Sequence, residues 1–216
     1  MAVFIVNIRI VNMKKVSLLA GLLFLFSAVS YAHGPVRGKM TATMDIEAPV
    51  ADVWEVIKNF DDMSWHPGIK SVSATNGNTK GSSRTLTLTS GGTITEELKK
   101  YDAKKMMYKY KITDMSIAKT VVYSNNEIEI PVLPVNNYGG TISVKAKGNA
   151  TVVTWIATYY RAYVNNVNPK DNPPVEITEA ASDEAVTAVF TEGLTSLLHK
   201  FEPNTLSSAI KFTMKR

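Results

Sequence analysis

The pattern of hydrophobic and polar positions first separates an N-terminal segment from the rest of the chain. A largely apolar run covers residues 16–29, after a pair of lysines and before the small residues Ser30 and Ala32. Basic residues, a short apolar run and small residues at −3 and −1 are typical of a secretory signal peptide. The apolar run is shorter than the roughly 20 residues that a membrane-spanning helix needs. The sequence therefore predicts a signal peptide at residues 1–32, cleaved after Ala32, and no permanent membrane anchor.

Beyond this segment, the period of the apolar positions changes from two residues to three or four. Residues 40–46 alternate between apolar and polar side chains, as a half-buried strand does. Residues 50–57 carry apolar side chains at helical spacing, and Pro49 suits the first turn of a helix. The Asp pair at 61–62 is suited to cap a second short helix, which the Pro-Gly pair at 67–68 would end. The pattern predicts one strand followed by two short helices.

Strand patterns dominate the middle of the chain. The segments with alternating or β-branched residues are 69–75, 82–90, 91–102, 104–113, 140–148 and 150–162. Ser90, Gly91 and Gly92 are typical of a hairpin turn between the second and third of these strands. The less regular stretch 120–134 fits either an added hairpin or a mobile flap. The sequence therefore predicts a long antiparallel run of strands.

The last long pattern is helical. Apolar residues three and four positions apart extend from about Thr178 to Phe201, and Pro203 follows them. Residues 164–177 are rich in Asn and Pro, which is typical of an irregular connection. Residues 204–216 have no clear pattern, so we expect this C-terminal tail to fray.

This order of elements predicts an α+β fold. A strand, two short helices, a run of antiparallel strands and one long helix suggest a curved antiparallel sheet wrapped around the C-terminal helix. Residues 33–203 have the length of one ordinary domain with a sizeable core. A sheet that curves around a helix leaves a cavity between the two, and that cavity is where we expect a binding site.

The charge and the composition narrow the function classes. The whole chain has 24 basic and 19 acidic residues, a net charge of +5. Three of the basic residues lie within residues 1–32, so 21 remain against 19 acids and the charge of the mature chain falls to +2. This balance gives no indication of nucleic-acid binding. An exported chain without cysteine relies on its core rather than on disulfides, which favours a bacterial periplasm.

Two charged residues occupy positions at which the strand alternation points inward. Arg84 shares its face with Leu86, and Glu96 shares its face with Leu98. With a turn centred on Gly91, Leu86 would lie opposite Glu96 and Arg84 opposite Leu98, which makes the two charges diagonal neighbours. Burying either charge alone costs several kcal/mol. We therefore expect either a structural salt bridge in the cavity wall or a pair that meets a polar ligand.

The segment Trp65-His66-Pro67 has two interpretations. In the first, Trp65 plugs the edge of the sheet and His66 is a polar corner residue. In the second, His66 lies at the mouth of a pocket as a hydrogen-bond donor or general acid, because imidazole titrates near neutral pH. No paired base stands beside it in the sequence, so no catalytic residue is assigned.

Aromatic residues with polar tips complete the candidate site. Tyr108, Tyr110, Trp155 and Tyr159 fall on the predicted inner face, where they either pack in the core or line a pocket. The full set of candidate cavity residues is Trp65, His66, Arg84, Glu96, Tyr108, Tyr110, Trp155 and Tyr159. The sequence suggests no metal site, and its glycines do not have the spacing of a phosphate-binding loop.

Several segments resemble a known superfamily. EAPVADVWEVIKNFDDMSWHPGIKSV, GSSRTLTLTSGGTITEELKKYD, YKYKIT and the long helix resemble the START-like helix-grip superfamily, in its polyketide cyclase/dehydrase and lipid transport branch. The resemblance covers roughly residues 39–201. Within that branch, the HGP segment, the WHP corner, TLTSGGTITEELKKYD and LPVNNY are most similar to MxaD-type periplasmic proteins of bacterial methanol oxidation.

The resemblance implies a function that the residues alone do not. It implies a non-enzymatic periplasmic protein without a cofactor of its own, which assists a quinoprotein methanol dehydrogenase in passing electrons to its c-type cytochrome. The alternative is a periplasmic carrier of a small hydrophobic or lipid-like ligand. A cyclase or dehydratase that uses His66 with Arg84 and Glu96 is a third hypothesis, supported only by superfamily membership and by the polar residues that face inward.

Overall fold

The computed structural model describes residues 34–216, so the predicted signal peptide lies outside the described residues. The elements in chain order are β1 (Gly38–Ile46), α2 (Val50–Ile57), β2 (Ile69–Ala74), β3 (Ser83–Leu88), β4 (Thr93–Asp102), β5 (Met107–Met115), β6 (Ile117–Tyr123), β7 (Asn126–Pro131), β8 (Val135–Lys147), β9 (Ala150–Arg161), η1 (Pro169–Asp171), η2 (Val175–Ile177), α3 (Glu179–His199), η3 (Ser207–Ala209) and β10 (Lys211–Lys215). Among the helices of this part of the chain, none is both long enough and apolar enough to cross a membrane.

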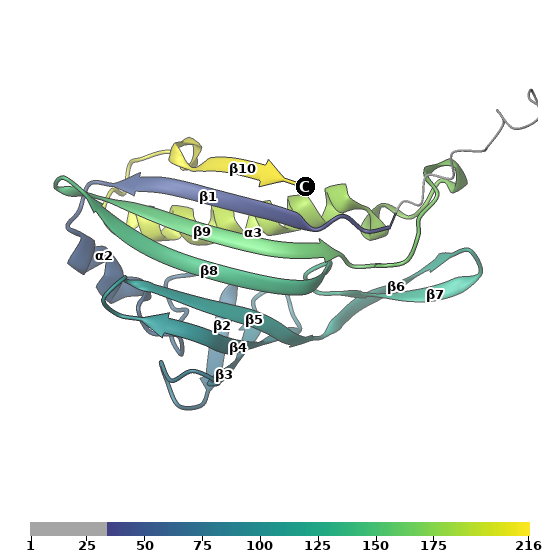
Figure 1. Cartoon of the computed structure of the whole chain (residues 1–216), viewed down its shortest axis with the longest axis horizontal. Helices are drawn as coiled ribbons and strands as arrows, with labels where there is room; N and C mark the ends of the chain where they lie inside the picture. The colour runs from purple at the N-terminus through teal and green to yellow at the C-terminus, as the bar shows by residue number, and fades with distance from the viewer. Residues whose placement is uncertain (1–33) are drawn as a thin grey trace, which may run out of the picture. The chain divides into compact units, whose positions relative to one another are not determined.

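One antiparallel sheet and one long helix make the framework. The eight strands of the sheet follow the order β10-β1-β9-β8-β5-β4-β3-β2, and α3 packs against β1 and β9 (Figure 1). Phe190, Leu194 and Leu197 on α3 are fully buried in the core between the helix and the sheet. The α+β helix-grip fold predicted from the sequence is therefore confirmed.

Only one of the two predicted short helices forms. After α2, residues 60–68 make a series of turns instead of a second helix. The side chain of Asp62 accepts a hydrogen bond from the backbone N–H of Ser64 at 2.8 Å, which closes a local turn rather than capping a helix. The prediction of a second helix is wrong for this reason. The turns bury Trp65 and His66, which are 1% and 3% exposed.

Residues 120–134, for which the sequence allowed either an added hairpin or a mobile flap, belong to a hairpin. β6 and β7 pair in a separate two-stranded sheet, joined by Ser124 and Asn125. Both turn residues have positive φ angles, 51° and 61°, as a two-residue type I′ turn requires. Tyr123 and Ile130 pack with Ile177 in a small second core. The hairpin therefore has apolar contacts of its own, and Figure 1 shows it projecting beyond the main sheet.

The C-terminal segment does not fray as expected. Residues 211–215 form β10, which pairs antiparallel with β1 so that Met214 lies opposite Met40 and Phe212 opposite Ala42. The strand pattern is weak in the sequence because most side chains of this edge strand are exposed. The expectation of a frayed tail is wrong, since β10 covers an edge that β1 would otherwise leave unpaired.

The hairpin between β3 and β4 has a different register from the predicted one. Arg84 lies directly opposite Glu96, and Leu86 lies opposite Ile94. The turn is therefore centred one residue earlier than Gly91. Each residue of β3 consequently lies opposite a β4 residue two positions earlier than predicted. A shift of two residues keeps every side chain on its predicted face. The two charges are consequently direct neighbours rather than diagonal ones.

Candidate functional site

A cavity of about 310 Å³ lies between the sheet and α3. Its wall comes from the 63–69 turn segment, from β3, β4, β5 and β9, from the start of β8, from the connections at 89–90 and 132–133 and from α3. Five of the eight candidate residues line it: His66, Arg84, Glu96, Tyr110 and Trp155. Most of the remaining wall is apolar. The inner face predicted from the strand alternation therefore does surround an internal space.

The other three candidates lie outside the cavity wall. The Trp65 ring packs 5.6 Å from the Trp155 ring in the core. Tyr108 packs 6.1 Å from the Phe60 ring, towards α2. Tyr159 donates its hydroxyl hydrogen to Asp183 Oδ1 on α3 at 2.8 Å. The core-packing interpretation fits all three of these residues.

Arg84 and Glu96 form a buried ion pair in the cavity wall. Arg84 Nε donates to Glu96 Oε2 at 2.6 Å, and Arg84 Nη2 lies 2.6 Å from the same oxygen. The two residues are 2% and 5% exposed. Since both charges are removed from water, each depends on the other for compensation.

Further contacts hold the guanidinium in place. Arg84 Nη1 donates to the Phe60 carbonyl at 2.6 Å, and the guanidinium carbon lies 4.3 Å from the centre of the Phe60 ring and 5.4 Å from that of Tyr110. Burial, the largest single effect, would lower the pKa of Arg84, but Glu96 together with Tyr108 and Tyr110 outweighs burial, and the net pKa is raised. Arg84 is therefore a permanent cation whose nitrogens already have partners.

The Glu96 carboxylate has one occupied and one available oxygen. Oε2 accepts both contacts from Arg84, whereas Oε1 accepts no hydrogen bond from the residues that the structure describes. Glu96 is part of the cavity wall. A charged acceptor at an apolar wall is a position at which a ligand donor gains a strong hydrogen bond.

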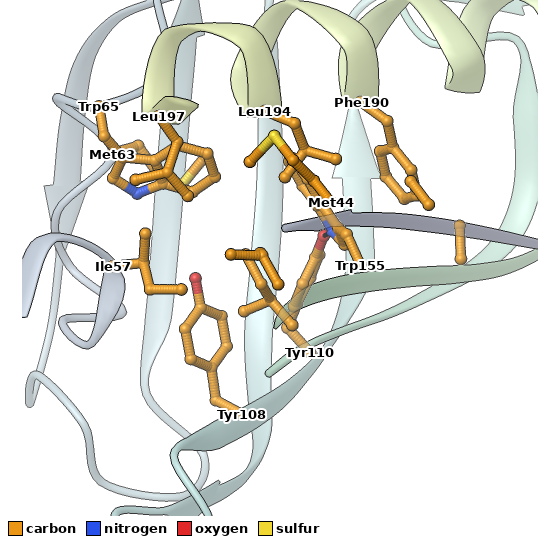
Figure 2. Close-up of a cluster of buried hydrophobic side chains, with 14 of the residues drawn as sticks. Met44, Ile57, Met63, Trp65, Tyr108, Tyr110, Trp155, Phe190, Leu194 and Leu197 are labelled. Carbon is orange, nitrogen blue, oxygen red and sulfur yellow. Dashed lines mark hydrogen bonds between the residues drawn. The ribbon is translucent and has the colours of Figure 1, made fainter. Parts of the chain in front are cut away.

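A second polar pair fixes the aromatic side of the cavity. Trp155 Nε1 donates to the Tyr110 hydroxyl at 2.8 Å, and the Trp155 ring stacks on Phe190 at 4.3 Å (Figure 2). Gly140, opposite Tyr110 on β8, makes room for the phenol, because a Cβ there would lie 2.1 Å from Tyr110 Cζ. Burial raises the pKa of Tyr110 well above its usual value. The hydroxyl therefore stays neutral.

Both ring nitrogens of His66 are engaged by the backbone. Nδ1 accepts a hydrogen bond from Gly68 N at 3.1 Å, and Nε2 lies 3.0 Å from the Val189 carbonyl oxygen on α3. Because a carbonyl only accepts, Nε2 carries the hydrogen and the ring is neutral. Burial lowers the pKa of His66, in agreement with that state. His66 therefore lines the cavity but has no free nitrogen for acid–base chemistry.

Glycines on two elements admit the His66 ring. A Cβ at Gly193 on α3 would lie 2.5 Å from His66 Cδ2, and a Cβ at Gly68 would lie 3.1 Å from His66 Cε1 and 2.8 Å from Glu192 Oε2. The His66 ring is thus clamped between the turn and the helix. The corner-residue interpretation describes it better than the general-acid one.

Sequence reasoning missed four wall residues with polar groups, Thr89, Ser90, Tyr138 and Glu192, of which the last two carry a phenol and a carboxylate. Tyr138 lies on β8 with its ring 6.1 Å from that of Tyr110, and the exposed Glu192 contributes a carboxylate from α3. Tyr138 was missed because β8 begins at Val135, before the expected strand. Glu192 was missed because the helical pattern was followed only through its apolar residues.

The described residues show no metal centre. Within residues 34–216, no three His, Asp or Glu side chains gather closely enough to hold a metal ion. The polar groups of the cavity residues are the Arg84–Glu96 pair, the engaged ring of His66, two tyrosines, the Trp155 indole N–H, the hydroxyls of Thr89 and Ser90 and one carboxylate at Glu192. This arrangement is suited to hold a ligand by shape and by a few directed hydrogen bonds.

The fold and the cavity define a helix-grip protein with an internal cavity. The chain belongs to the polyketide cyclase/dehydrase and lipid transport family, which matches residues 37–202. No curated protein matches the chain.

Solved structures with this fold come from bacteria and plants. An uncharacterised protein from Bacillus thuringiensis is 26% identical, with a TM-score of 0.57 over 76% of this chain and 98% of that one. The protein XoxI from Bacillus cereus is 26% identical, with a TM-score of 0.57 over 76% of this chain and 95% of that one. Norcoclaurine synthase from Thalictrum flavum, solved with dopamine and hydroxybenzaldehyde, is 15% identical, with a TM-score of 0.51 over 80% of this chain and 91% of that one, which shows the fold alone.

Proposed function

We propose that this protein binds a small, largely apolar molecule in the cavity between the sheet and α3. The observation that carries the proposal is the cavity itself, about 310 Å³ in volume, with a buried ion pair in an otherwise mostly apolar wall. Its size is at the lower end of the roughly 300 to 1,000 Å³ of small-molecule sites. A compact molecule fits this volume better than a lipid with two acyl chains.

Binding without catalysis agrees with the state of the polar groups. Both nitrogens of His66 are held by backbone groups, and burial keeps the pKa of Tyr110 far above neutrality. A general acid or base needs a proton that it can exchange near the working pH. The cavity residues therefore favour a carrier over a cyclase or dehydratase.

Filling the cavity tests this proposal. Leu88 lines the cavity and is half-buried, so Leu88→Trp should place a large ring in the binding space. Val122, on β6 and 65% exposed, gives the matched control Val122→Trp. Native mass spectrometry of protein from its own host should show a small-molecule adduct in the wild type and in Val122→Trp, and none in Leu88→Trp. An adduct that persists in folded Leu88→Trp would contradict binding in this cavity.

The second candidate is an accessory role in periplasmic methanol oxidation. Three of the four segments that resemble MxaD-type proteins meet at the same cavity: the WHP corner provides His66, TLTSGG provides Leu88, Thr89 and Ser90, and LPVNNY provides Leu133 and Tyr138. This convergence favours one shared task for these segments. We propose that the chain is exported to the periplasm, where it assists electron transfer from a quinoprotein methanol dehydrogenase to a c-type cytochrome.

Two measurements test the accessory role. N-terminal sequencing of the protein from a periplasmic fraction should begin at His33, as the predicted cleavage after Ala32 requires. Purified protein should accelerate cytochrome reduction by the dehydrogenase of the same organism, and Leu88→Trp should reduce that effect more than Val122→Trp does. An unchanged rate with the wild-type protein would exclude this role and leave the ligand-binding proposal in place.

A further inference from the structure

The charges of the titratable side chains in the cavity wall do not sum to zero. Arg84 contributes +1, whereas Glu96 and Glu192 contribute −1 each, and His66 is neutral because both of its nitrogens are held in one tautomer. The sum over the wall is therefore +1 − 1 − 1, or −1. Glu192 is exposed, so its charge acts on a ligand that approaches from solvent.

Arg84 does not offer a free cation to an anionic ligand. Its Nε and Nη2 contact Glu96 Oε2, and its Nη1 donates to the Phe60 carbonyl. A carboxylate that displaced Glu96 from Arg84 would leave the buried Glu96 charge without its partner, which is strongly unfavourable. The pair therefore disfavours fatty acids and other carboxylates.

A cationic ligand is also disfavoured at this depth. The Arg84–Glu96 pair is neutral as a unit, and an additional cation beside Glu96 would lie close to the buried guanidinium. A neutral donor avoids this repulsion and still reaches Glu96 Oε1, a buried charged acceptor that has no hydrogen-bond partner among the residues that the structure describes. Hydrogen bonds to charged groups are the stronger class, while an apolar body suits the remaining wall.

We infer that the ligand is a neutral molecule with an apolar body and a hydroxyl group that donates its hydrogen to Glu96 Oε1. This inference rests on the proposed function, because it names the class of molecule that the cavity takes. Glu96 lines the cavity, so a donor to its available oxygen and the apolar body are held by the same space.

A matched set of four compounds tests the inference on the wild-type protein. Ethylbenzene supplies the apolar body, 4-ethylphenol adds a donor, 4-ethylanisole keeps the oxygen but removes the donor, and 4-ethylbenzoate adds a negative charge. Binding is followed by NMR titration at neutral pH. We expect 4-ethylphenol to bind about tenfold or more tightly than 4-ethylanisole, and 4-ethylbenzoate to bind most weakly.

Two variants assign the effect to the two carboxylates. Glu96→Gln removes the charged acceptor and should reduce the preference for 4-ethylphenol over 4-ethylanisole to about threefold or less. Glu192→Gln should strengthen 4-ethylbenzoate binding by about twofold to threefold, because it removes one negative charge from the cavity wall. Glu184→Gln is the matched control, because Glu184 is an exposed residue of α3 outside the cavity wall.

The outcomes separate this inference from the proposed function. If none of the four compounds binds, the cavity does not accept small molecules and the proposed function fails. If ethylbenzene binds but 4-ethylphenol has no advantage over 4-ethylanisole, or 4-ethylbenzoate binds most tightly, this inference is overturned and the cavity remains a binding site. Should Glu96→Gln fail to fold, the wild-type series alone decides.

Discussion

Arg84 and Glu96 lie directly opposite each other on β3 and β4, and a single oxygen of Glu96 accepts both contacts of the guanidinium. Each side chain is almost completely buried, so neither charge has water as an alternative partner. The pair therefore fixes the polar centre of the cavity wall and leaves the second Glu96 oxygen available.

A double-mutant cycle measures how strongly this pair is coupled. Glu96→Gln or Arg84→Met alone should lower the free energy of unfolding by roughly 3 to 5 kcal/mol, because each leaves an uncompensated buried charge. The double variant should lose less than the sum of the two. Urea unfolding of the four proteins gives the coupling energy.

The matched control for this cycle is the pair Lys99–Glu97 on the same strand. Their side chains are 43% and 35% exposed, with a contact of 2.6 Å. Exposed pairs of this kind contribute about 0 to 1 kcal/mol. A coupling energy for Arg84–Glu96 no larger than that of Lys99–Glu97 would contradict a mutually dependent buried pair.

Gly193→Ala should destabilise the protein although it improves the helix propensity of α3. In an exposed helix, alanine is better than glycine by about 1 kcal/mol. Here the new Cβ would lie 2.5 Å from His66 Cδ2, and overpacking of this kind costs roughly 1 to 3 kcal/mol. In a His66→Ala background the same change should be much less unfavourable, and an equal loss in both backgrounds would show that His66 is not the obstacle.

His66 should make stability depend on pH. Burial lowers the pKa of His66 in the folded protein, whereas an unfolded histidine titrates near about 6.5. As the pH falls through about 6.5, the unfolded chain takes up the proton first, so the free energy of unfolding decreases until the lowered folded pKa is reached. The contribution of His66 to the free energy of unfolding is therefore fully present above about pH 6.5 and is lost as the pH falls below that value.

The measurement compares the wild type with His66→Gln by urea unfolding at about pH 7.5 and about pH 5. The wild type should lose more stability between the two pH values than the variant, since all other titrating groups are common to both. Equal losses would show that His66 is not held neutral in the folded state.

Removal of β10 should loosen β1 selectively. A chain that ends after Ile210 keeps that buried residue but lacks the strand that pairs with Lys39–Thr43. Hydrogen exchange should accelerate at the β1 amides that bond to β10, while the amides that bond to β9 keep their protection. Unchanged exchange along the whole of β1 would mean that β10 does not protect this edge in solution.

The sequence was sufficient to predict which side chains lie on the inner face of the sheet. It was not sufficient to predict which of these side chains line the cavity and which pack elsewhere in the core. Arg84, Glu96 and Tyr110 share an inward parity that survives a register shift of two residues. Tyr108 and Tyr159 have the same parity and yet pack elsewhere in the core. The places where α2 and α3 cover the sheet decide which inward residues meet the cavity, and a strand period carries no information about that.

The start of β8 shows where local signals mislead. Asn137 has a positive φ of 48°, and the register shifts between Asn136 and Gly139, so the alternation around Tyr138 is interrupted. Asn and Gly favour turns, so the sequence pattern placed the start of this strand at residue 140 rather than at Val135. Gly140 instead leaves space for the Tyr110 ring, a requirement that only the tertiary structure reveals.

Tyr110→Phe should destabilise the protein through Trp155. The Tyr110 hydroxyl accepts the Trp155 Nε1 hydrogen at 2.8 Å within the core, and its loss leaves that buried donor unpaired, at about 1 to 3 kcal/mol. Trp155→Phe in the Tyr110→Phe background removes the donor as well, so the double variant should lose less than the sum of the single changes. Tyr101→Phe, at a half-buried tyrosine outside the cavity wall, is the control and should change stability by about 0.5 kcal/mol at most. If urea unfolding shows equal effects for Tyr110→Phe and Tyr101→Phe, the hydrogen bond between Trp155 and Tyr110 does not stabilise the aromatic side of the cavity.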